Sequence, residues 1–135
     1  FGSGEEDRLE ISVGNDMEEL VNISAGIHKF GEGRNISQKL LKDLALCIEE
    51  IGGNVIHHAF RPGEKKWFDI MILDKKDLLI VRLRDNGAAF NPVNYCDDYD
   101  MKKEKYGLQL IRSMADDMKY KRTLEMNNIM ITFKK

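Results

Sequence analysis

A long amphipathic helix is the feature that most constrains how this chain of 135 residues can fold. The helix is expected to start at Asn35 or Ser37 and to run to about Phe60. Its apolar residues recur at helical spacing and form one stripe for burial, made of Leu40, Leu44, Cys47, Ile48, Ile51 and Val55. Glu50 and Asn54 fall just off this stripe, one turn apart. The pattern therefore predicts a carboxylate and an amide that project together from the edge of the core.

Two glycines lie inside the same helical pattern. Gly52 and Gly53 each cost about 1 kcal/mol relative to alanine in a helix interior, so we expect a need for close approach beside Asn54. On their own, a glutamate and an asparagine at this spacing are more often solvated helix surface. The motifs further along the chain decide between the two interpretations.

The rest of the chain alternates strand and helix patterns. Strands are expected at 8–13, 66–73 and 77–83, a helix from the caps Asn15 or Asp16 to Phe30, a second helix over 107–118, and a last hairpin of 120–124 and 129–133 joined around 126–128. The two middle strands share a short polar joint, which predicts an antiparallel hairpin. This order predicts an α/β (α+β) two-layer sandwich, with a mixed, mainly antiparallel sheet and helices on one face.

Composition limits the class of protein. The chain is 42% hydrophobic and 33% charged, with a net charge of −2, so charge gives no reason to expect nucleic acid or membrane contact. Only two cysteines occur, Cys47 and Cys96, which favours a reducing, cytoplasmic setting over a disulfide framework. No apolar run approaches the roughly 20 residues that span a bilayer. Residues 1–4 are interpreted as a linker or cloning remnant, and residues 5–135 as one domain.

Two further motifs follow the long helix. Asp85 ends a strand and is followed by Asn86 and Gly87, which together indicate a turn. A polar stretch over 91–105 has no apolar period, and a loop this long in a compact domain is usually functional or disordered. The run Tyr106-Gly107-Leu108-Gln109-Leu110-Ile111 then opens a helix. Read without the rest, these are an ordinary hairpin turn and an ordinary helix start.

In this order the three motifs resemble those of the GHKL (histidine-kinase-like) ATPases, and most of all the anti-sigma-factor serine/threonine kinases among them. The resemblance implies a Bergerat-type fold, with ATP held between the helices and the sheet under a mobile lid. It implies that Glu50 is the general base or orients the attacking group, and that Asn54 binds magnesium. It also implies that Asp85 accepts a hydrogen bond from the adenine amino group and that Gly87 lets the backbone approach the base.

The chain departs from this pattern at two positions. Ala89 stands where the resembled family has a second glycine, and Lys105 stands where an earlier glycine of the next motif is usual. Gly107 and Leu108 match the end of that motif, and backbone amides at the start of a helix can bind phosphate. We therefore include Ala89, Lys105, Gly107 and Leu108 with the nucleotide-binding candidates.

The resemblance implies a domain that binds ATP and Mg²⁺ and phosphorylates a small antagonist protein, with that antagonist or a sigma factor as partner. A homodimer is also expected. One alternative is a regulatory module that binds nucleotide without transferring phosphate, either alone or as a part excised from a larger protein. Another alternative is a degenerate interaction domain that binds no nucleotide. The presence of Glu50, Asn54 and Asp85 argues against this alternative.

Overall fold

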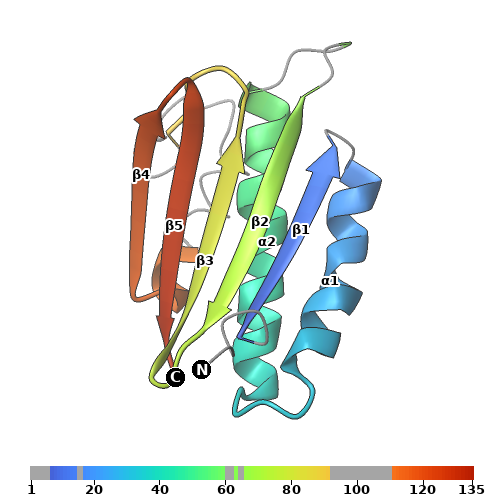
Figure 1. The fold of residues 1–135 in the computed structure, drawn as a ribbon, viewed down its shortest axis with the longest axis vertical. Helices are drawn as coiled ribbons and strands as arrows, with labels where there is room; N and C mark the ends of the chain where they lie inside the picture. Colours follow the sequence, from blue (N-terminus) through green and yellow to red (C-terminus); the bar gives the residue numbers. More distant parts are fainter. Residues whose placement is uncertain (1–6, 15–16, 60–62, 64–65, 92–110) are drawn as a thin grey trace.

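A computed structural model describes residues 7–14, 17–59, 63, 66–91 and 111–135. Two helices pack on one face of a sheet (Figure 1). The elements are β1 (Arg8–Gly14), α1 (Met17–Gly31), α2 (Gln38–Ala59), β2 (Trp67–Asp74), β3 (Leu78–Asp85), β4 (Asp117–Thr123) and β5 (Met126–Lys134). This arrangement confirms the predicted two-layer fold class.

The described strands form a five-stranded sheet in the order β1-β2-β3-β5-β4. Each neighbouring pair is antiparallel, so the described part of the sheet is antiparallel throughout. One row of paired residues crosses the whole sheet through Ile11, Ile70, Leu83, Ile129 and Tyr120. Because strand side chains alternate between faces, this row and every second row from it point toward the helices.

Helix α2 supplies the other half of the core. Leu44, Cys47, Ile48 and Ile51 have no exposed surface, which confirms the predicted stripe, although Leu41 is buried where the pattern placed Leu40. Burial raises the pKa of the Cys47 thiol to about 12, so this side chain stays protonated and packs as a small apolar group.

The start of α2 is set by a side-chain cap. The Leu40 amide donates to Ser37 Oγ at 3.1 Å, so Ser37 and not Asn35 is the N-cap. The helix continues without interruption through Gly52 and Gly53. The predicted caps of the first helix, Asn15 and Asp16, lie outside the described residues, as do residues 1–4.

The sequence-based prediction was wrong in two details near the C-terminus. The last predicted helix was expected to reach Met118, but helical structure ends at Met114 and the chain enters β4 at Asp117. The hairpin turn was expected around 126–128, but it lies at Leu124 and Glu125, whose φ angles are 53° and 61°. Both differences have the same reason. β4 and β5 pair continuously from Asp117 to Thr123, and β5 already begins at Met126, before the asparagines that indicated a turn.

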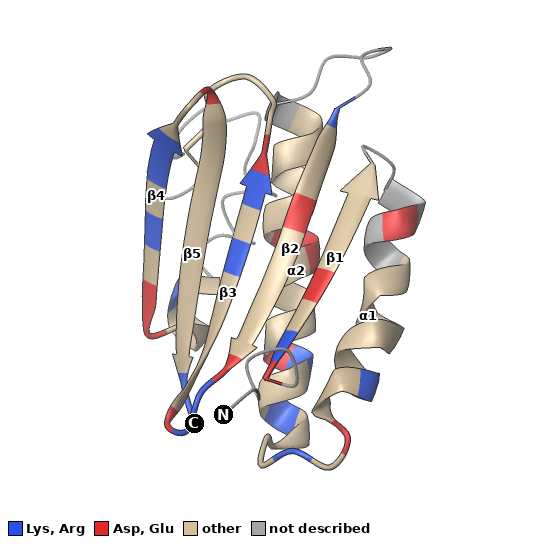
Figure 2. Ribbon diagram, viewed as in Figure 1, with Lys and Arg blue, Asp and Glu red and all other residues tan. Residues whose placement is uncertain are grey.

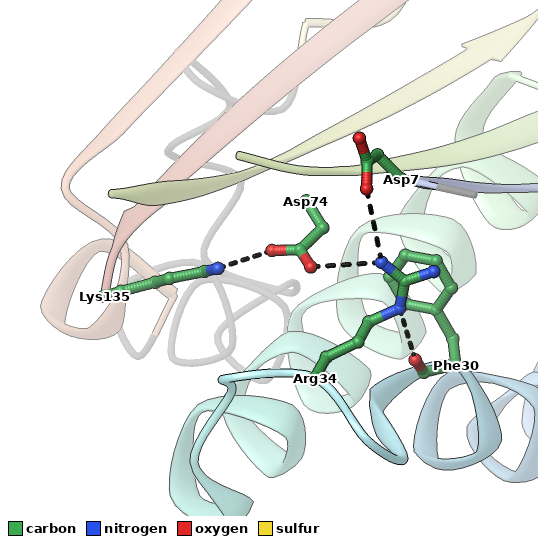
Figure 3. A network of polar contacts seen from close by, with 5 residues as sticks. All are labelled: Asp7, Phe30, Arg34, Asp74 and Lys135. Atoms are coloured by element: carbon green, nitrogen blue, oxygen red, sulfur yellow. Dashed lines mark hydrogen bonds and ion pairs between the residues drawn. The ribbon is translucent and has the colours of Figure 1, made fainter. Parts of the chain in front are cut away.

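A polar cluster closes the end of the sandwich that is opposite to the end of β3 (Figure 3). Asp74 pairs with Arg34 Nη1 at 3.2 Å and with Lys135 Nζ at 2.5 Å. Arg34 also donates from Nε to the Phe30 carbonyl at 2.8 Å, and its guanidinium lies 4.0 Å from the centre of the Phe30 ring. Arg34 Nη1 is 3.8 Å from Asp7 Oδ1. These contacts join the loop between the helices to the edge of the sheet and the chain end.

Replacing Asp74 with asparagine is expected to lower the free energy of unfolding by about 2 kcal/mol. The side chains of Asp74 and Lys135 are only 11% and 15% exposed, so the substitution leaves two cations short of a counter-charge. Urea unfolding at neutral pH measures the change. Asp77→Asn, an exposed carboxylate in the adjacent turn, is the control and should change stability by less than about 0.5 kcal/mol. Equal losses in both variants would contradict a specific role for Asp74.

Candidate functional site

A buried carboxylate ends the central strand β3. Asp85 is 1% exposed, and its Oδ1 accepts hydrogen bonds from the Gly87 amide at 2.8 Å and from Asn127 Nδ2 at 3.0 Å. Burial raises the pKa of Asp85, while the bonds from Asn127 and Gly87 and the charge of Arg122 act in the opposite direction. Both described hydrogen bonds end on Oδ1, so the second oxygen is left for another donor.

Asn127 organises the surroundings of this carboxylate. It lies on β5 directly opposite Asp85 and is 1% exposed. Besides its bond to Asp85, Nδ2 donates to the Ala88 carbonyl at 2.8 Å. Its oxygen accepts three hydrogen bonds, from the Phe90 amide at 3.2 Å, Tyr120 OH at 2.5 Å and Arg122 Nη1 at 3.0 Å. One amide thus connects the end of β3, the following loop and β4.

The loop after β3 is also held by contacts from β4 and from β2. Arg122 Nη1 donates to the Gly87 carbonyl at 3.1 Å, and the Trp67 amide on β2 donates to Asn86 Oδ1 at 3.1 Å. Gly87 is buried, whereas Ala89 is exposed. The backbone beside Asp85 is therefore fixed before any ligand arrives, which reduces the entropy lost on binding.

Asn127 was not predicted as a site residue, because the adjacent pair Asn127 and Asn128 indicated a turn. A signal was present nonetheless. Ile129, Ile131 and Phe133 occupy every second position of the strand, and continuing that alternation backwards places Asn127 on the buried face. A polar side chain at an inward position of a strand needs partners, and here it has them.

The long helix brings a second buried polar group to the same end of the molecule. Asn54 is 3% exposed, and its Nδ2 has no hydrogen-bond partner among the described residues. Helix α2 reaches its C-terminal end where β2 begins and β3 finishes (Figure 1), and β2 pairs with β3 there through Phe68 and Asp85. A buried polar atom without a partner requires an explanation, and a bound ligand is one.

The remaining predicted residues divide into two groups. Glu50 lies one turn before Asn54 on α2 and is partly buried. Lys105, Gly107 and Leu108 lie outside the described residues, as does most of the polar stretch over 91–105. The structure thus places Asn54 and Asp85 in the layer between helix and sheet at one end, with Glu50 one turn closer to the N-terminus of α2.

Comparison with known proteins defines the class. The sequence profile of the histidine kinase-like ATPase domain matches residues 13–133, and the chain belongs to this family. The predicted resemblance to the histidine-kinase-like ATPases is thereby confirmed.

Two curated relatives are protein kinases by name. The serine/threonine-protein kinase BtrW of Bordetella bronchiseptica is 26% identical over 102 residues, which cover 71% of this chain and 72% of the relative. The serine-protein kinase RsbW of Listeria monocytogenes is 30% identical over 93 residues, which cover 62% of this chain and 59% of the relative. The chain therefore spans only part of the length of these relatives.

Solved structures agree on the fold. The histidine kinase domain of a blue-light activated histidine kinase from Erythrobacter litoralis superposes with a TM-score of 0.60 at 16% identity, over 87% of this chain and 59% of that one. The RsbU and RsbW domains of a Mycobacterium tuberculosis protein give a TM-score of 0.64 at 10% identity, over 95% of this chain and 33% of that one. Within the described residues, no helix is long and apolar enough to cross a membrane.

Replacing Asn127 with alanine is expected to lower the free energy of unfolding by about 3 kcal/mol, because buried donors and acceptors around Asp85 lose their partner. Asn127→Asp places a second carboxylate beside Asp85, so the pKa of the pair rises. The stability of that variant should therefore be greatest at acidic pH and fall as the pH rises toward neutrality.

Both changes are measured by urea unfolding across a pH series. Asn128→Ala is the matched control, because Asn128 is the next residue of the same strand and faces away from the helices. Its Nδ2 makes a local bond to the Met126 carbonyl at 3.3 Å, so the loss should stay below about 0.5 kcal/mol. Similar losses at positions 127 and 128 would contradict the central role of Asn127.

Proposed function

We propose that this chain binds ATP and Mg²⁺ between α2 and the end of β3, and that it transfers the terminal phosphate to a serine or threonine of a small antagonist protein. One observation carries the proposal. Asp85 is a buried carboxylate whose described hydrogen bonds both end on Oδ1, and Asn54 is a buried amide whose Nδ2 has no partner among the described residues. Both lie at the same end of a histidine kinase-like ATPase fold.

Asp85 supplies the selectivity for adenine in this proposal. An ionised carboxylate only accepts hydrogen bonds, so it pairs with the exocyclic amine of adenine and repels the carbonyl that guanine presents at the same position. Gly87, held by Asp85 and Arg122, leaves room for the base beside the backbone. The role of Ala89 is to line the same turn, with one methyl group more than glycine.

Asn54 fits the magnesium ion. Magnesium takes oxygen ligands, accepts a neutral side-chain carbonyl, and completes its shell with phosphate and water. The amide oxygen of Asn54 would hold the ion, and the unpaired Nδ2 would remain for a phosphate oxygen. When bound, magnesium neutralises charge on the phosphates. Lys105 and the backbone amides of Gly107 and Leu108, which lie outside the described residues, are proposed to contact the phosphates.

Glu50 is the proposed general base. It lies one helical turn from Asn54, so its carboxylate can receive the proton of an attacking hydroxyl near a phosphate held by Asn54. The kinase names of the relatives favour this reading. The second candidate, a nucleotide-dependent regulatory module without phosphate transfer, is favoured by the departures at Ala89 and Lys105. A cytoplasmic location, a sigma factor as partner, a homodimer and a domain over 5–135 belong to the same proposal.

Isothermal titration with ATP in the presence of Mg²⁺ tests the proposal. We expect a dissociation constant between the micromolar and millimolar ranges, and binding of GTP that is weaker by about tenfold or more. Titration of ATP without magnesium provides the comparison for the ion. Absence of ATP binding, or equal binding of ATP and GTP, would overturn the assignment.

A further inference from the structure

The face of the sheet that points away from α1 and α2 carries a second candidate site. The two described helices pack on the other face (Figure 1), and this one contains a groove of about 450 Å³ over β3, β5 and β4. Four cationic side chains line it: Arg82, Arg84, Lys119 and Lys121. Figure 2 shows the corresponding bands of Lys and Arg on β3 and β4, and Asp and Glu on β1 and β2.

The positive charge of this groove is compensated only from its borders. No carboxylate is among the described residues that line it. Asp69 Oδ2 is 4.0 Å from Arg84 Nη2, Asp117 Oδ2 is 3.7 Å from Lys119 Nζ, and the charge of Glu10 acts on Arg82. The Nε atoms of Arg82 and Arg84 are buried and lack hydrogen-bond partners in the described part of the chain. The two guanidinium groups therefore keep hydrogen-bonding capacity that the described residues do not use.

The two arginines also disfavour each other. They lie two residues apart on β3 and therefore on the same face of the sheet. Burial, and next the charge of Arg84, lower the pKa of Arg82, while Glu10 and Asp69 partly offset this. An anionic group placed between the two guanidinium groups would relieve this repulsion and accept hydrogen bonds from them.

Apolar surface completes the groove. Met130 on β5 is 41% exposed, and Leu124 at the β4–β5 turn is 85% exposed. Both line the same groove as the four cations. An inorganic anion would satisfy the arginines but leave this apolar surface in water, whereas a protein segment with both kinds of side chain covers it.

We propose that this groove binds an acidic segment of a partner protein in which carboxylates are interspersed with apolar side chains. Cations two residues apart on one strand are separated by about 7 Å, and β3 and β4 lie about 10 Å apart across β5. Carboxylates two residues apart in an extended segment match the first spacing. Every second side chain of an extended segment points to the same side. On that side, acidic side chains contact Arg82 and Arg84, and apolar side chains contact Met130 and Leu124.

This surface is separate from the candidate nucleotide site. Arg84 and Asp85 are neighbours on β3, and their side chains therefore point to opposite faces of the sheet. The partner segment and the nucleotide can bind at the same time. The proposal consequently does not depend on nucleotide binding, and the two can fail separately.

Fluorescence anisotropy with a labelled, end-capped peptide of two Glu-Ser-Glu-Ser-Leu-Ser repeats, which carries its Glu and Leu side chains on one side when extended, tests the proposal on the chain of 135 residues. Arg82→Gln combined with Arg84→Gln should weaken binding by about tenfold or more. Lys75→Gln combined with Lys76→Gln removes the same charge from the exposed β2–β3 turn and should leave affinity within about twofold. Affinity for the unaltered chain should fall as salt is raised.

Three further measurements complete the test. Met130→Ser should weaken the Glu and Leu peptide while leaving a peptide of glutamates alone unaffected, and ATP titration of every variant should match the unaltered chain. Equal peptide affinity for the two double variants would overturn the proposal. A dimer seen by light scattering for the unaltered chain, and lost only in the arginine double variant, would also overturn the proposal. In that case the groove would bind a second copy of this chain. Binding to vesicles of anionic lipid without binding to the peptide would also overturn it.

Discussion

Replacing Asp85 with asparagine is expected to weaken ATP binding by about a hundredfold or more while leaving the protein folded. Asparagine has the same shape, and its oxygen can keep the bonds from Gly87 and Asn127. At the position of the second carboxylate oxygen, however, it presents an NH₂ group to the amino group of adenine. Two donors then face each other in a buried site, and isothermal titration measures the loss.

The same substitution should not lower stability at neutral pH. Because burial raises the pKa of Asp85 above its unfolded value, the ionised carboxylate opposes folding at neutral pH, and this opposition fades as the pH falls. Asp85→Asn should therefore be as stable as the unaltered chain or more stable near pH 7, with the difference shrinking toward about pH 4. Asp69→Asn, on the other face of the adjacent strand, is the control and should bind ATP normally. Undiminished binding by the Asp85 variant would remove the adenine assignment.

Replacing Glu50 with alanine or glutamine is expected to reduce phosphate transfer by about a hundredfold or more, with ATP affinity changed by less than about threefold. The proposal gives Glu50 a role only when a hydroxyl loses its proton, so binding of nucleotide in the ground state should not depend on it. Single-turnover conversion of radiolabelled ATP measures the rate of transfer, to water or to a protein acceptor.

Glu49 offers a matched control for this prediction. It precedes Glu50 on the same helix and is also partly buried, but it points about 100° away around the helix axis. Glu49→Gln should retain the rate of the unaltered chain. If the variants at 49 and 50 lose activity equally, or if the Glu50 variants lose none, Glu50 is not the base.

The fold could be predicted from sequence because its helices and strands have strong periodic patterns. Five of the six apolar positions predicted for the stripe of α2 are buried, and the alternation of β3 marks which side of the strand faces the core. The short polar joint marks the β2–β3 hairpin. The turn of the C-terminal hairpin was predicted less accurately. Leu124 and Glu125 adopt positive φ angles that non-glycine residues seldom take, so no residue-type signal marks this turn.

The candidate site could be predicted only in part. Asn54 and Asp85 were predicted from spacing and motif order, and both side chains are buried. Asn127 was not predicted because its role depends on a long-range pairing. It lies on β5 directly opposite Asp85 of β3, 42 residues away in the sequence. Arg82 and Arg84 were not predicted as site residues for a similar reason. Alternating charge on a strand is usual, and only the structure shows that their Nε atoms are buried without partners among the described residues.

The proposed function requires the carboxylate of β3 and the amide of α2 to contact one nucleotide. A crystal structure of this chain with a non-hydrolysable ATP analogue and Mg²⁺ tests this requirement. We predict that the adenine amino nitrogen lies within hydrogen-bond distance of Asp85 and that the Asn54 amide oxygen coordinates the ion. An analogue bound elsewhere, or bound with either side chain turned away from it, would contradict the account.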